Sequence, residues 1–98
     1  MITREGDHLQ VSGRLTMDTV ASLFNTSLQP EKEGTLVIDL AQVEAVDSAA
    51  VSLLLSWLRR TQSNKVSIAF ANAPENLLSL ARLYGVLELL PLHPTTVL

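Results

Sequence analysis

Residues 36–58, with the sequence LVIDLAQVEAVDSAAVSLLLSWL, decide the fold of this chain. They open with a short apolar run closed by Asp39, which predicts a buried strand because β-branched residues pack well in a sheet covered on both faces. The next residues, 41–46, predict a connection. The second half of the stretch has helical spacing. The stretch therefore predicts a strand that leads through a connection into a helix.

Two polar residues, Asp47 and Ser48, stand where this helix should begin. Both carry side-chain oxygens that can accept a hydrogen bond from the free N–H groups of a first helical turn. Either residue is therefore a candidate N-cap. In both cases the sequence predicts a helix whose first turn exposes a hydroxyl group.

The helix has more large apolar residues than one buried face requires. The spacing i, i+3, i+4, i+7 predicts a core-facing stripe, and it is made by Val51, Leu54, Leu55 and Leu58. Leu53 and Trp57 lie four residues apart and project roughly 100° or more away from that stripe. They need a second partner, which the sequence leaves open as another helix of the same chain or another protein.

The composition predicts one folded domain, residues 1–98. A chain of 98 residues buries roughly two thirds of its unfolded surface, which is enough for a single core. With 47% apolar and 17% charged residues, the chain has the composition of a globular domain and not of a disordered tail.

Charge and cysteine content exclude several classes of function. The net charge is −3 and no basic cluster is longer than Arg59-Arg60, so we expect no nucleic-acid partner. The chain has no cysteine, and its first ten residues lack the basic and apolar regions of a signal peptide, so we expect a cytoplasmic protein. No apolar run approaches the roughly 20 residues of a membrane helix. Any membrane association is expected to be indirect, through a partner.

The remaining elements follow from local patterns of turn residues and apolar spacing. In chain order they are strands at 2–5 and 8–12, a helix at 17–28, a strand at 66–71, a helix that buries Leu77, Leu80, Ala81 and Tyr84 and stops at Gly85, and an edge strand at 89–92. The resulting order is β-β-α-β-α-β-α-β. Because strand-helix-strand units impose parallel neighbours, we expect an α/β fold with a mixed four- to five-stranded sheet and helices packed on it.

The central stretch resembles the signature of the STAS domain, the fold of anti-sigma factor antagonists. The resemblance is carried by Asp39-Leu40-Ala41, then Val43, then Val46-Asp47-Ser48 opening a helix. Gly13-Arg14-Leu15-Thr16 is similar to the second strand and turn of that family, and residues 77–90 are similar to its third helix and following segment. The resemblance covers nearly the whole chain and implies a STAS-like fold.

Within the family the chain is most similar to the MlaB branch, on the segment Leu83-Tyr84-Gly85-Val86 and on its brief C-terminus. That resemblance implies a non-catalytic STAS subunit without a cofactor. The subunit would dock on and regulate the cytoplasmic ATPase of an ABC transporter that maintains the phospholipid asymmetry of the outer membrane. It would then lie at the cytoplasmic face of the inner membrane, held there by its partner.

The resemblance places the docking surface at the start of the helix, where the hydroxyl follows the aspartate. Aromatic residues surrounded by small ones are typical interface anchors, and an arginine suits an interface rim. The predicted partner-binding residues are Thr16, Asp47, Ser48, Ala49, Ala50, Leu53, Trp57 and Arg60. Ser48 is interpreted as a cap that also contacts the partner, whereas Asp47 is either a structural turn acid or a direct contact.

Two alternatives stay open. The first is an anti-sigma factor antagonist that binds an anti-sigma factor kinase and is switched by phosphorylation of Ser48. Phosphorylated antagonists usually have glycine where this chain has Ala50, and the family's common acid is replaced by Thr16, so both departures weaken this reading. The second is a structural or weak homodimer, in which Leu53 and Trp57 would be buried against a second copy.

An enzyme is not expected. The only histidines are His8 and His93; neither stands in a triad context, and no G-x-S-x-G elbow surrounds Ser48. The histidines and carboxylates show no metal-binding spacing, and the chain has no glycine-rich phosphate loop. The sequence therefore predicts a binding protein without a catalytic or metal site.

Overall fold

The computed structural model describes residues 2–26, 28–29 and 35–92. The strands are β1 (Ile2–Glu5), β2 (His8–Leu15), β3 (Thr35–Val46) and β4 (Ser67–Ala71), and the helices are α1 (Ser48–Ser63) and α2 (Glu75–Leu83), with short 3₁₀ turns η1 (Val20–Leu23) and η2 (Leu87–Leu89). The four strands form one sheet in the order β1-β2-β3-β4. β1 is antiparallel to β2, whereas β2, β3 and β4 are parallel. The predicted α/β fold with a mixed sheet is confirmed.

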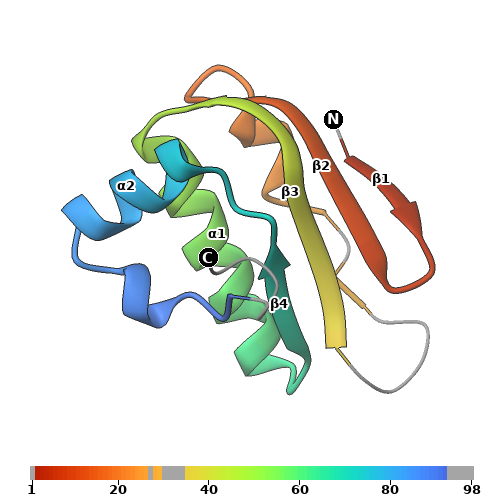
Figure 1. Ribbon diagram of the computed structural model, residues 1–98. Coiled ribbons are helices and arrows are strands. Elements are labelled where there is room, and N and C mark those ends of the chain that lie inside the picture. Colours follow the sequence, from red (N-terminus) through yellow and green to blue (C-terminus); the bar gives the residue numbers. More distant parts are fainter. Residues whose placement is uncertain (1, 27, 30–34, 93–98) are drawn as a thin grey trace.

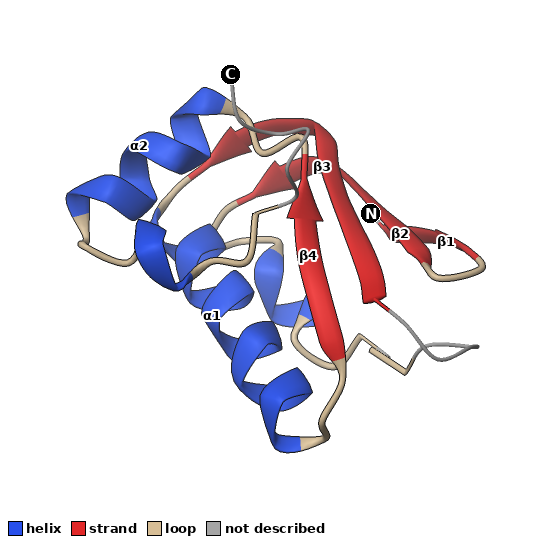
Figure 2. Ribbon diagram, turned by 60° about the horizontal axis from the view of Figure 1, so that its bottom comes forward, coloured by secondary structure: helices blue, strands red, loops and turns tan. Residues whose placement is uncertain are grey.

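The helices lie on one face of the sheet (Figures 1 and 2). Side chains alternate along β2, so that Leu9, Val11 and Leu15 are buried in the core while their neighbours face the other side. The predicted hairpin between β1 and β2 is confirmed, with Glu5 opposite His8. Its turn uses Gly6 at a positive φ of 60°, a conformation that glycine adopts without steric cost.

β3 is much longer than the sequence predicts. The region expected to be a connection, residues 41–46, continues the strand alongside β2. The register shifts twice along this pair, first between Gln10 and Ser12 of β2, and such bulges break the alternation of a regular strand. Leu40 and Val43 are therefore both buried although they are three residues apart. Because a strand is predicted from apolar residues two apart, this spacing of three did not predict that the strand continues.

The helix predicted at 17–28 is wrong. The only helical structure in the described part of this segment is the single 3₁₀ turn η1. Its last carbonyls are hydrogen-bonded elsewhere: Leu23 C=O accepts the indole N–H of Trp57, and Phe24 C=O accepts from the guanidinium of Arg60. A continuous α-helix would use those carbonyls internally. The segment instead lies along α1 and is held there by side chains of that helix.

The C-terminal part also differs from the prediction. Residues 87–89 form η2, and Leu92 alone makes a parallel bridge to Phe70 of β4, so the edge strand expected at 89–92 does not form. In α2, Leu77 is buried as predicted, whereas Tyr84 follows the helix and is exposed. Within the described residues, no helix is both long and apolar enough to cross a membrane.

Candidate partner-binding surface

Asp47 organises the start of α1. One carboxylate oxygen, Oδ1, accepts the N–H of Ala49 at 2.8 Å and the other, Oδ2, accepts the N–H of Met17 at 3.0 Å. Asp47 has extended backbone angles and is the N-cap, so the cap is not Ser48. Because both oxygens are engaged within the chain, the structure favours the structural reading of Asp47. The carboxylate also ties the segment after β2 to the start of the helix.

Ser48 is the first residue of α1 and is exposed. Its hydroxyl makes no hydrogen bond with any residue that the structure describes. Met17, fixed beside it through Asp47, has 74% of its surface exposed. Ala49 is half-buried and Ala50 is buried. The start of α1 thus presents a free hydroxyl and an exposed thioether on a rigid backbone.

Leu53 and Trp57 are core residues and not partner anchors. Their exposed fractions are 0% and 1%, and the indole N–H of Trp57 donates to Leu23 C=O at 3.2 Å. The carbonyl of Leu23 in η1 covers the polar edge of the indole, and both side chains are buried inside the domain, so the prediction that they reach an interface is wrong. A homodimer stays a prediction, but Leu53 and Trp57 would not form its contact because they are buried within one chain.

The buried face of α1 is turned relative to the predicted one. The buried residues of α1 are Ala50, Val51, Leu53, Leu54, Trp57 and Thr61. At near 100° per residue, the centre of this set lies about 80° from the centre of the predicted stripe. Leu55 and Leu58, which were assigned to the core, are only partly buried.

Arg60 is half-buried and holds the loop after η1. Its guanidinium donates to the carbonyls of Phe24 and Thr26, the latter at 2.6 Å. These hydrogen bonds give Arg60 a role within the chain, and its place at an interface rim stays a prediction. Its neighbour Arg59 is exposed and makes no ion pair with the described residues. The free cation on α1 is therefore Arg59.

Thr16 is also inside the protein, with 8% of its surface exposed. Its backbone N–H donates to the hydroxyl of Thr19 at 3.0 Å. Its own hydroxyl oxygen is buried and has no hydrogen-bond partner in the described part of the chain. Thr16 is therefore an interior residue of the segment between β2 and η1. It is not part of the exposed docking surface, where the sequence predicted it.

The surface that α1 offers runs along its whole length. We define the outer strip as the half-buried Leu55 and four exposed residues, Ser48, Ser52, Arg59 and Gln62. Their spacing of i, i+4, i+7, i+11 and i+14 keeps them within about 40° of one line on the helix. They lie opposite the buried face. The sequence contains this spacing, but the predicted core stripe included Leu55, so the strip was not predicted as a surface.

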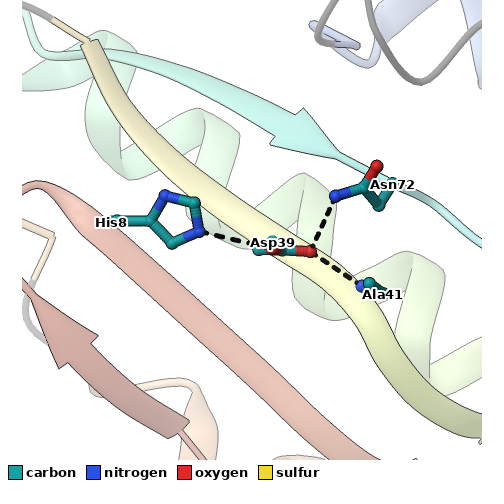
Figure 3. Close-up of polar contacts among 4 residues, drawn as sticks. All are labelled: His8, Asp39, Ala41 and Asn72. Carbon is teal, nitrogen blue, oxygen red and sulfur yellow. Dashed lines mark hydrogen bonds and ion pairs between the residues drawn. The ribbon is translucent and has the colours of Figure 1, made fainter.

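A second polar cluster lies on the sheet face away from the helices (Figure 3). Asp39 lies 3.3 Å from the imidazole Nε2 of His8, and its other oxygen accepts the N–H of Ala41 at 2.9 Å and the amide of Asn72 at 3.2 Å. Burial acts to raise the pKa of Asp39, but these hydrogen bonds and the nearby imidazole together lower it. The carboxylate thus joins β2, β3 and the loop after β4.

This cluster is structural. Asp39 and Gln42 flank the first register shift of β3 and Ala41 lies within it, so the carboxylate satisfies a backbone N–H at the bulge. A shallow depression of about 330 Å³ beside it is lined by Glu5, His8, Gln10 and Asp39. Among the described residues, no group of three or more histidines, cysteines or carboxylates could hold a metal ion. His93, the other histidine, lies outside the described residues.

The comparisons with known proteins identify the family. The family model described as "Mlab, STAS domain" matches residues 1–91. A comparison with curated proteins found no match to the chain. The match includes the mixed sheet, the Asp47 cap and all of α1. The chain therefore belongs to the STAS domain family, in its MlaB branch.

Proposed function

We propose that this STAS domain docks on the cytoplasmic ATPase of an ABC transporter and regulates it. The transporter would be one that maintains phospholipid asymmetry of the outer membrane, and the domain would act at the inner-membrane face through this partner. The observation that carries the proposal is the exposed hydroxyl of Ser48 at the start of α1, which makes no hydrogen bond with the described residues. STAS domains are in general non-catalytic, and we propose a binding role without a cofactor.

The start of α1 suits a docking role because it is preorganised. Asp47 fixes the positions of Met17 and Ala49 through two hydrogen bonds, so little conformational entropy is lost there on binding. Methionine side chains adapt to irregular apolar surfaces and are enriched in interfaces. Met17 and Ser48 together therefore offer an adaptable apolar contact beside a hydrogen-bonding group.

Co-purification of the domain with its cognate transporter ATPase tests the proposal. Ser48→Arg places a long cation at the centre of the proposed contact and is expected to abolish the complex. Ser79→Arg is the matched control, because Ser79 is also an exposed helical serine but lies on α2, and it is expected to leave the complex intact. Met17→Glu is a second variant of the same contact. If Ser48→Arg and Met17→Glu, tested separately, each recover as much ATPase as the wild type does, the proposal is refuted.

The second candidate function is an anti-sigma factor antagonist switched by phosphate on Ser48. The exposure of this hydroxyl favours it, and a helix N-terminus tolerates added negative charge. Against it, the Asp47 carboxylate already binds the N–H of Ala49, and like charges would meet there. Incubation with ATP and a cognate anti-sigma factor kinase, followed by intact mass measurement, discriminates: an unchanged mass removes this candidate.

A further inference from the structure

The contact at Ser48 and Met17 is too small to be a whole interface. A specific protein interface buries roughly 800 Å² on each partner and involves roughly 20–30 residues a side. The docking surface must therefore continue beyond the first turn of α1. The outer strip provides the continuation, because Ser48 and Gln62 are about 21 Å apart along the helix at 1.5 Å per residue.

The far end of the outer strip opens into an apolar depression, which we name the leucine cleft. It has a volume of about 290 Å³ and is lined by Leu55, Leu58, Arg59, Gln62 and Leu89. Leu89 of η2 is 59% exposed. Leu55 and Leu58 pack on the core from α1 but are only partly covered. Three leucines from two elements thus form an open apolar site that is continuous with the strip.

The charge in the leucine cleft distinguishes it from the rest of the surface. The chain carries a net charge of −3, yet among the described residues that line the cleft Arg59 alone is charged. The neighbouring Arg60 donates to backbone carbonyls, and Arg82 of α2 lies 3.8 Å from Glu75. Arg59 therefore offers a cation that makes no ion pair with the described residues beside an apolar depression, and the complementary group is a carboxylate next to an apolar side chain.

We propose that the leucine cleft binds a segment of the same ATPase that presents an apolar side chain beside an aspartate or glutamate. This inference rests on the proposed function and extends its contact from the start of α1 to the end of the helix. The apolar side chain would enter between Leu58 and Leu89, and the carboxylate would pair with Arg59. A second copy of this chain is the competing occupant.

The test compares the affinity of purified variants for the ATPase at low and moderate salt. Leu89→Asp and Arg59→Glu are each expected to weaken binding at least tenfold, and Arg59→Ala is expected to reduce the salt dependence of the dissociation constant. Leu83→Asp and Arg82→Glu are the controls, because they place the same changes on exposed residues of α2, and both are expected to bind as the wild type does. Circular dichroism and thermal melting verify that each variant is folded.

The outcomes separate this inference from the proposed function. Wild-type affinity for Leu89→Asp and Arg59→Glu, with binding still lost in Ser48→Arg, would overturn the leucine cleft as a contact and leave the proposed function standing. Wild-type binding in Leu89→Asp, Arg59→Glu and Ser48→Arg would overturn the leucine cleft as a contact and the proposed function as well. An equal loss in Leu83→Asp would also overturn the assignment to this cleft. Sedimentation of the domain without the ATPase tests the second copy as occupant. A concentration-dependent dimer that Leu89→Asp dissociates would overturn the assignment of the cleft to the ATPase.

Discussion

Replacing Trp57 by phenylalanine separates a core role from an interface role. The indole is 1% exposed and donates to Leu23 C=O at 3.2 Å. Leu23 C=O also accepts from the N–H of Thr26, so the variant leaves no orphaned acceptor and the lost hydrogen bond costs about 1 kcal/mol. The smaller ring leaves a cavity that costs a further 1–2 kcal/mol, roughly. The free energy of unfolding should therefore fall by about 2–3 kcal/mol.

For a domain of this length, each kcal/mol lowers Tm by roughly 4–8 °C, so Trp57→Phe should melt about 8–24 °C below the wild type. Urea unfolding followed by far-UV circular dichroism measures the change without relying on tryptophan fluorescence. Leu83→Ala, at a residue 75% exposed, is the control and should change stability by at most about 0.5 kcal/mol. Wild-type stability in Trp57→Phe together with lost ATPase binding would refute the core assignment and restore the interface reading.

Three further predictions concern Thr16, Arg60 and Asp39. Thr16→Val removes a buried hydroxyl that has no partner and should raise the free energy of unfolding by about 1 kcal/mol; a lower urea midpoint would contradict this. Arg60→Ala should destabilise by about 2 kcal/mol because two carbonyls lose a charged donor, whereas Arg59→Ala should be nearly neutral; equal urea midpoints would show that Arg60 does not hold the loop. The lowered pKa of Asp39 means that its carboxylate stabilises the fold above the unfolded-state pKa, near 3.9, and that this contribution is lost as the pH falls through the folded-state value. The stability advantage of the wild type over Asp39→Asn should thus shrink between pH 6 and pH 3, and a constant difference across that range would contradict the assignment.

Local patterns predicted the elements whose signals are local. The β1–β2 hairpin follows from a turn dipeptide between alternating strands, and the start of α1 follows from a capping residue before helical spacing. Gly85 ends the α2 region at a positive φ of 71°, as a helix stop should. The parallel pairing of β2, β3 and β4 follows from the crossovers that join them. These features need no knowledge of distant residues.

The errors arose where tertiary contacts override local preference. Residues 17–28 have helical apolar spacing, but in the structure the carbonyls of Leu23 and Phe24 accept hydrogen bonds from Trp57 and Arg60 of α1. β3 continues to Val46 through two bulges, and these interrupt the alternation of buried and exposed side chains from which a strand is predicted. Leu53 and Trp57 lie off the predicted core stripe of α1 but are buried in the structure, and Leu23 of η1 accepts the indole N–H of Trp57. Ser48 therefore remains at the centre of the proposed site. Leu53, Trp57 and Thr16 are buried in the domain, and Arg60 holds the loop after η1.

Thiol protection tests the central claim, that the outer face of α1 is the surface that meets the ATPase. The chain has no cysteine, so Ser48→Cys, Ser52→Cys and Ser79→Cys each give a single reactive thiol. With saturating ATPase, a maleimide should modify the thiols at positions 48 and 52 at least tenfold more slowly than in the free domain, while the thiol at position 79 on α2 reacts at an unchanged rate. Unchanged rates at positions 48 and 52, with the complex shown to be present, would contradict the account.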